Sequence, residues 1–131
     1  MRMLSASVAM LVVALVGASE CSAKESGALD GKTFRVQLHQ SAQAAGDPDD
    51  LVFADGTFRS VACDRAHFSA AAYSTTKLGD AVAFSARTES PSAGSMTWQG
   101  TVKGSTVIGT AVWQKTGEAP VTQTFDGTLQ P

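Results

Sequence analysis

Two short stretches of the sequence carry side chains that could bind a metal ion. Cys63 and His67 offer a thiolate and an imidazole, whereas residues 47–50 (DPDD), followed by Asp55, offer carboxylate oxygens. Zinc needs three or four ligands, and the other histidine, His39, is expected on the outer face of the first strand. The acidic stretch lacks the spacing of an EF-hand calcium loop. We therefore expect no metal and no other cofactor.

Catalytic arrangements of other kinds are not indicated either. Serine, histidine and aspartate are all present, but nothing in their spacing arranges them as nucleophile, base and orienting group. The sequence has no Gly-x-Ser-x-Gly stretch, no glycine-rich phosphate loop and no paired carboxylates on neighbouring expected strands. We expect a protein that is not an enzyme.

The sequence contains two cysteines, Cys21 and Cys63, and three states are open to them. An exported chain meets an oxidising compartment, which favours a Cys21–Cys63 disulfide. The second state is lipid attachment, because the position of Cys21 resembles the bacterial lipoprotein signal, although Glu20 stands where that signal has a small residue. Two free thiols are the third state.

Aromatic side chains provide the most informative candidate site. They alternate with polar residues along the expected strands, so they share one face of the sheet. The same face also carries small residues, namely Ser60, Ala62, Ala86, Gly100, Gly109 and Ala111. The residues expected to contact a small ligand are Trp98, Trp113, Phe53, Phe58, Phe84, Met96, Ser60 and Gln123. A fully packed interior is the alternative, and both stay open.

The strands that carry these residues follow from alternation and turn signals. Strands are expected at residues 32–39, 51–62, 68–77, 80–90, 96–113 and 120–129, with a long loop over residues 41–50. Residues 51–62 form a hairpin, in which a type I′ turn at Asp55-Gly56 pairs Phe53 with Phe58.

The segment 96–113 (MTWQGTVKGSTVIGTAVW) is a second hairpin. Gly104-Ser105 suits a type II′ turn, because that turn needs glycine at its first central position. The resulting pairs are Gly100–Gly109, Trp98–Ala111 and Met96–Trp113. Facing glycines are expected where a strongly bent sheet brings its inner face together.

Eight short strands joined by tight turns predict an all-β fold, specifically an eight-stranded antiparallel up-and-down β-barrel. Closure removes the exposed edges that a small sheet would otherwise have to protect. A two-layer sandwich is the alternative, but it needs longer crossover connections, and only residues 40–50 could supply one.

Residues 1–18 are expected to be a secretory signal peptide. Arg2 gives a positive start, residues 4–16 are apolar, and small residues follow. About 13 apolar residues are fewer than the ~20 that span a bilayer. Residues 19–31 then form a strap or tail, and residues 32–131 form the barrel domain. We expect the mature protein to be secreted or periplasmic, without a transmembrane segment.

The charge pattern argues against nucleic acid and anionic lipid as partners. Without residues 1–18, the chain has nine Lys and Arg against twelve Asp and Glu, a formal charge of −3. These charges are scattered, with no basic run and no segment in which arginines alternate with aromatic residues.

From residue 29 to residue 129 the expected architecture resembles the calycin group, which includes lipocalins, fatty-acid-binding proteins and avidin-like barrels. Lipocalins open their first strand with Gly-x-Trp, and Gly31-Lys32-Thr33-Phe34 places a Gly-x-x-Phe there. No binding residue can be transferred from this resemblance. The chain also resembles small bacterial inhibitors of secreted metalloproteases, which are eight-stranded barrels with a disulfide and an N-terminal segment that enters the protease.

Two functions are expected from these observations. The first is a non-enzymatic binding module whose barrel receives a small, largely apolar molecule. The second is a protein-interaction domain, such as a protease inhibitor or an envelope-associated lipoprotein, that acts through residues 19–28 or its loops.

Overall fold

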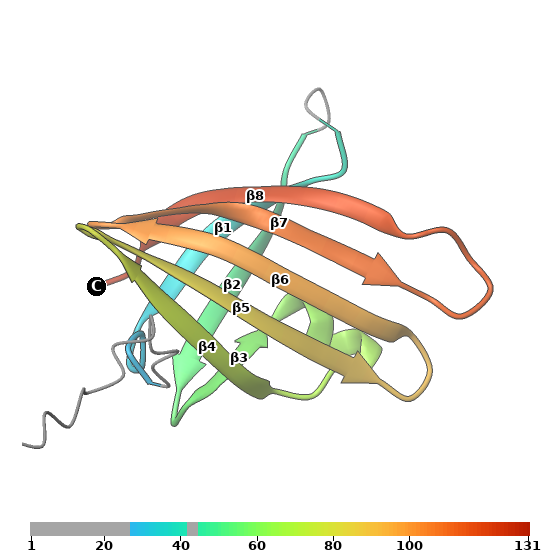
Figure 1. Ribbon diagram of the computed structural model, residues 1–131. Helices are drawn as coiled ribbons and strands as arrows, with labels where there is room; N and C mark the ends of the chain where they lie inside the picture. The colour runs from blue at the N-terminus through green and yellow to red at the C-terminus, as the bar shows by residue number, and fades with distance from the viewer. Residues whose placement is uncertain (1–26, 42–44) are drawn as a thin grey trace, which may run out of the picture.

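The computed structural model describes residues 27–41 and 45–131, which form a closed barrel of antiparallel strands (Figure 1). Each strand pairs with the next one along the chain, and the last strand pairs with the first. The strands are β1 (Thr33–His39), β2 (Asp47–Ala54), β3 (Thr57–Ser60), β4 (Ala71–Leu78), β5 (Ala81–Ser90), β6 (Gly94–Lys103), β7 (Thr106–Gln114) and β8 (Val121–Leu129). The predicted eight-stranded up-and-down barrel is confirmed.

Both predicted hairpin turns are confirmed. Asp55 and Gly56 have φ angles of 53° and 74°, as a type I′ turn requires at its two central positions. Gly104 has a φ of 58°, as required at the first central position of a type II′ turn. The register agrees as well, with the pairs Phe53–Phe58, Gly100–Gly109, Trp98–Ala111 and Met96–Trp113.

The second strand begins earlier than the sequence predicts. Residues 47–50 were expected in a loop, but β2 starts at Asp47, where it pairs with Leu38 of β1. On its other side, β2 pairs with β3 only from Leu51 onward. Pro48 therefore lies where one side of the strand has no partner in β3, which is the kind of place where a strand tolerates proline.

After β3 the chain turns into a short 3-10 helix, η1 (Ala62–Ala66). The expectation that Ala62 faces the interior is wrong, because β3 ends at Ser60 and Ala62 is exposed. Cys63 and Ala66 of η1 are partly buried against the core. His67 ends the helix with a left-handed φ of 64°.

One end of the barrel is closed by residues 27–32, and we call it the Leu29 end. The Leu29 side chain is only 2 % exposed. Its backbone N–H donates to Tyr73 Oη at 3.0 Å, and Tyr73 Oη donates to Asp30 Oδ1 at 2.7 Å. Asp30 in turn accepts a hydrogen bond from the Gly56 N–H, so this end is tied to the β2–β3 turn.

The opposite end, which we call the η1 end, holds η1 together with the β5–β6 turn and the β7–β8 connection (Figure 1). Ser90 Oγ donates to the carbonyl oxygen of Ala66 at 2.6 Å, which fixes η1 to β5. Trp113 Nε1 donates to the carbonyl oxygen of Ala93 at 2.7 Å. The side chains of Cys63 and Ala66 in η1 and of Ala93 in the β5–β6 turn pack against the core at this end.

Residues 1–26 contain the predicted signal peptide, Cys21 and most of the predicted strap, and they lie outside the described residues. The interaction role predicted for residues 19–28 therefore stays a prediction. Within the described ranges, no helix has the length and apolar character needed to cross a membrane.

Candidate functional site

The middle of the barrel is filled with aromatic rings in direct contact. The ring centroid of Phe53 lies 5.2 Å from that of Phe58 and 5.0 Å from that of Phe84. The Phe58 centroid lies 5.2 Å from the Trp98 centroid. All four side chains are at most 3 % exposed. The structure thus brings four of the predicted site residues together as one packed cluster.

Two polar atoms inside the barrel have no hydrogen-bond partner among the described residues. They are Trp98 Nε1 and Thr88 Oγ1, in residues that are 0 % and 2 % exposed. Because Trp98 pairs with Ala86 and Met96 pairs with Thr88, the two residues are diagonal neighbours on adjacent strands. A buried polar atom without a partner costs about 1–3 kcal/mol, so such atoms are rare in native proteins and require an explanation.

Thr88 was not among the predicted site residues, although the sequence contained the necessary signal. The alternation that places Phe84 and Ala86 on the inner face of β5 also places Thr88 there, two residues further along. Extending this alternation by two more residues would have identified Thr88 as an inner-face residue.

The other predicted site residues lie toward the η1 end. Met96 is 6 % exposed, whereas Trp113 and Gln123 are only partly buried. Gln123 pairs with Ala111, which is fully buried, so its side chain has the inner-face parity that the sequence predicts. Ser60 is 2 % exposed at the end of β3.

A buried carboxylate, which the sequence analysis considered only as part of the acidic stretch 47–50, lies beside Ser60. Asp49 is 5 % exposed and accepts hydrogen bonds from Ser60 Oγ and, at 2.8 Å, from the Ala62 N–H at the start of η1. Burial raises the pKa of Asp49 above its ordinary value, and the two hydrogen bonds partly oppose that shift. The burial of Asp49 was missed because residues 47–50 were predicted to be a loop.

Cys63 is a free thiol in the structure, which differs from the predicted Cys21–Cys63 disulfide. Cys21 lies outside the described residues, and Cys63 lies at the η1 end, opposite the end where residues 27–32 join the barrel. Burial raises the pKa of the Cys63 thiol, and the nearby Asp49 and Asp64 raise it further. Since the thiolate is the reactive form, Cys63 is a weak nucleophile.

The residues considered as metal ligands are not brought together. Within residues 27–41 and 45–131, no three side chains of His, Cys, Asp or Glu meet in a way that could hold a metal ion. His39 instead lies with Nε2 3.1 Å from Asp126 Oδ1 on the outer face.

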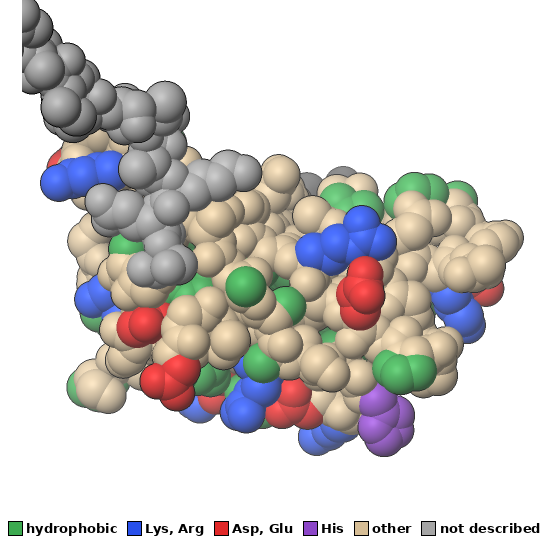
Figure 2. All heavy atoms as spheres, turned by 60° about the horizontal axis from the view of Figure 1, so that its bottom comes forward, with side chains coloured by type: hydrophobic (Ala, Val, Ile, Leu, Met, Phe, Trp, Pro, Cys, Tyr) green, Lys and Arg blue, Asp and Glu red, His purple; other side chains and the backbone are tan. Residues whose placement is uncertain are grey.

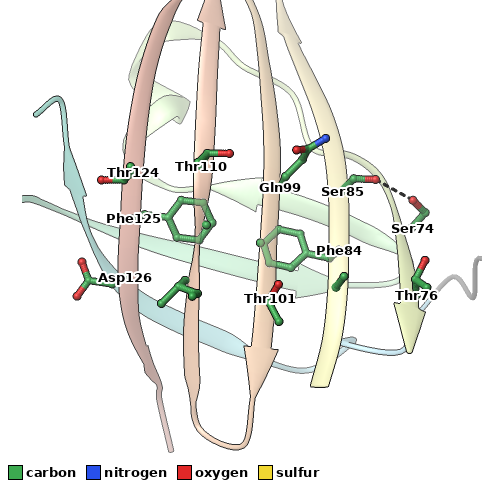
Figure 3. A pocket seen from close by; sticks show the side chains of 14 residues that line it. Ser74, Thr76, Phe84, Ser85, Gln99, Thr101, Thr110, Thr124, Phe125 and Asp126 are labelled. Atoms are coloured by element: carbon green, nitrogen blue, oxygen red, sulfur yellow. Dashed lines mark hydrogen bonds between the residues drawn. The ribbon is translucent and has the colours of Figure 1, made fainter. Parts of the chain in front are cut away.

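The outer face of the barrel carries a shallow groove of about 730 Å³ across β4 to β8, which we call the outer groove (Figure 3). Gly100 and Gly109 face each other at its centre, and the rings of Phe84 and Phe125 lie beneath them. A Cβ at Gly100 would come within 2.6 Å of the Phe84 ring and 3.0 Å of the Phe125 ring. The glycines therefore let the sheet and the rings approach closely.

Polar side chains cross this groove in one line. The pairs Ser74–Ser85, Ser85–Gln99, Gln99–Thr110 and Thr110–Thr124 are directly opposite one another on successive strands. We call Ser74, Ser85, Gln99, Thr110 and Thr124 the polar row, and Figure 3 shows it running across the strands. The sequence did not reveal this row, because it depends on the register of all five strands together.

Comparison with protein-family models, with curated proteins and with solved structures found no match to this chain. The likeness to calycin proteins is therefore a likeness of architecture, an eight-stranded antiparallel closed barrel.

Proposed function

We propose that this chain is an exported, non-enzymatic binding module that holds one small, largely apolar molecule inside the η1 end of its barrel. The observation that carries the proposal is the pair of buried polar atoms, Trp98 Nε1 and Thr88 Oγ1, that lack partners among the described residues. A ligand acceptor placed between them would satisfy both, and the free energy lost by leaving them unpaired would become binding free energy.

The interior becomes more polar toward the η1 end, which supports this location. The Leu29 end is closed by a buried leucine and lies next to the fully buried Phe34 and Phe53. Toward the η1 end the inner face instead carries Ser60, Thr88 and the carboxylate of Asp49. A ligand with a polar group is therefore oriented with that group toward the η1 end.

The groups at the site favour a ligand whose hydrogen-bond acceptor is uncharged. Trp98 Nε1 can only donate a hydrogen bond, and Thr88 Oγ1 can donate one as well. An anionic acceptor would have to enter the same interior as the buried Asp49 carboxylate, and like charges repel strongly at low dielectric. A ketone, quinone or ether oxygen on an apolar body fits these conditions.

A binding role rather than catalysis is supported by the state of the two reactive groups. The raised pKa of Cys63 leaves its thiol protonated. Asp49 is already engaged by Ser60 Oγ and the Ala62 N–H, so it is held in place as part of the structure.

Isothermal titration of the protein with naphthoquinone, with decanoic acid as the anionic comparison, tests the proposal. We expect naphthoquinone to bind and Thr88→Val and Trp98→Phe each to weaken binding about three- to tenfold, as expected for one lost hydrogen bond. Thr88→Val should raise the free energy of unfolding of the ligand-free protein, because it replaces a buried hydroxyl that has no partner among the described residues with a methyl of similar shape.

Tyr73→Phe is the matched control, because Tyr73 holds the Leu29 end, away from the proposed site, and its hydroxyl already bonds to the Leu29 N–H and to Asp30. It should lower stability and leave the ligand's polar contact intact. If naphthoquinone does not bind, or if Thr88→Val and Trp98→Phe bind it as well as the wild type, the proposal is wrong.

A further inference from the structure

The polar row is a regular ladder of hydrogen-bonding groups on the outside of the barrel. It places one hydroxyl or amide on each of five neighbouring strands, β4 to β8. Neighbouring strands lie about 4.8 Å apart, so the groups repeat at that spacing along a line of roughly 19 Å. That spacing is close to the length of one sugar unit in an extended glycan chain.

Most of these groups are available to a ligand. Within the row, Ser74 Oγ and Ser85 Oγ bond to each other at 3.0 Å (dashed line in Figure 3). The side chains of Gln99, Thr110 and Thr124 are exposed and make no hydrogen bond to the part of the chain that the structure describes. These three side chains offer both donors and acceptors.

The groove is also free of basic residues, which distinguishes it from the surrounding surface. Elsewhere the barrel surface carries ion pairs, including Arg35–Asp50, Arg59–Asp64 and Arg87–Glu89. Figure 2 shows acidic and basic side chains interspersed on the face drawn there. The groove is lined by one charged side chain, Asp126, at its β8 edge, and that carboxylate lies 3.1 Å from His39 Nε2.

The residues that line the outer groove exclude several classes of ligand. A polyanion finds no cation in the groove, and a hydrocarbon would bury the hydroxyls and the amide without partners, at a cost of several kcal/mol. A peptide strand cannot add to a sheet edge here, because the barrel is closed and its strands already pair on both sides of the groove. A neutral polyhydroxylated chain satisfies the row and also covers Ile108, which is 63 % exposed at the groove.

We propose that the outer groove binds a neutral glycan chain, whose hydroxyl groups bond to Gln99, Thr110 and Thr124 while a sugar face packs on Ile108. This site is separate from the interior of the barrel, since the row points outward and Trp98 points inward. The two sites can therefore succeed or fail independently.

Amide NMR spectra of the full chain, titrated with cellohexaose, chitohexaose and maltohexaose, test the inference. We expect at least one of these probes to shift the Gln99 side-chain amide and the backbone amides of Thr110 and Thr124 at millimolar concentration. Thr124→Ala should weaken that binding about three- to tenfold, which is the effect of one hydrogen bond.

Thr128→Ala is the matched control, because Thr128 is also an exposed threonine of β8 but does not line the groove. It should bind the glycan like the wild type. Absence of shifts with all three hexasaccharides, equal weakening by both alanine variants, or stronger shifts with hexaalanine than with any glycan would each overturn the inference. None of these outcomes would bear on the proposal that naphthoquinone binds inside the barrel, which is tested separately.

Discussion

The hydroxyl group of Tyr73 joins three separate segments of the chain. It accepts a hydrogen bond from the Leu29 N–H and donates one to Asp30, whose carboxylate accepts a hydrogen bond from the Gly56 N–H in the β2–β3 turn. Burial, followed by the hydrogen bond to Asp30, raises the pKa of Tyr73 to about 12. One side-chain atom therefore stabilises the closure of the Leu29 end.

Tyr73→Phe should lower the free energy of unfolding at neutral pH by about 1–3 kcal/mol, because it leaves the buried Leu29 N–H without an acceptor. In the wild type, Tyr73 ionises first in the unfolded chain, at its ordinary pKa of 10.0, and in the folded chain only near 12. The contribution of the Tyr73 hydroxyl to the free energy of unfolding is therefore complete below pH 10.0 and is lost as the pH rises to about 12. Urea unfolding should show the two proteins converging over that interval, and a constant difference would contradict the assignment.

Asp49 gives a second pH dependence of the same origin but in the acidic range, since burial disfavours its charged form. Its pKa in the folded state is raised above the ordinary 3.8, so the wild type loses stability as the pH rises from that value through the folded-state pKa. Asp49→Asn keeps one acceptor oxygen for the Ala62 N–H, and its amide nitrogen can donate to Ser60 Oγ, so both contacts can be made without a charge. We expect the stability of Asp49→Asn relative to the wild type to increase between acidic and neutral pH in urea unfolding. If the free energies of unfolding of the two proteins changed in parallel with pH, the Asp49 carboxylate would not be desolvated.

At the scale of the strands, Gly100 and Gly109 set how closely β6, β7 and the interior rings approach. A Cβ at Gly109 would meet the carbonyl oxygen of Gln99 and lie 2.7 Å from Gly100 Cα, whereas a Cβ at Gly100 would meet the ring atoms of Phe84 and Phe125. Backbone atoms cannot move aside as rings can. Gly109→Ala should therefore destabilise the barrel by about 1–3 kcal/mol, and Gly100→Ala by less. Equal losses in urea unfolding would show that strand spacing is not the limiting contact.

The hairpins could be predicted from the sequence because their determinants are local. Asp55-Gly56 and Gly104-Ser105 specify their own turns, and alternation on both sides then fixes the register of the neighbouring pairs. The inner-face positions of Trp98 and Gln123 follow from the same parity. The closed barrel was predictable to the extent that it is a chain of such hairpins.

The features that depend on distant partners could not be predicted in this way. The sequence places Asp49 in an acidic loop, whereas pairing with Val36 of β1 puts it in a strand, and Ser60 and the Ala62 N–H then hold its buried carboxylate. The end of β3 before η1 likewise depends on contacts with β2 and with Ser90 of β5. The polar row depends on the registers of four neighbouring strand pairs, from β4–β5 to β7–β8. Of these, the sequence predicted only the register between β6 and β7.

At the scale of the whole molecule, closure of the barrel gives a single sheet two separate faces. The inner face holds the aromatic cluster and the buried polar pair, while the outer face of the same strands holds the polar row. Closure is completed where β8 pairs with β1, and that seam leaves neither strand with a free edge. The integrity of both proposed sites therefore depends on it.

The close approach of the strands at this seam depends on Gly127 of β8, because a Cβ there would meet the carbonyl oxygen of Arg35 and lie 2.6 Å from Val36 Cα. Gly127→Val should force β1 and β8 apart and expose two unpaired edges, which promote strand pairing between molecules. Light scattering after size-exclusion chromatography should detect larger species than in the wild type. Thr128→Val, which places the same side chain at the next, outward-facing position, should elute like the wild type. If the Gly127→Val protein also elutes like the wild type with unchanged stability, closure does not depend on this contact, and the barrel tolerates a wider seam than its geometry indicates.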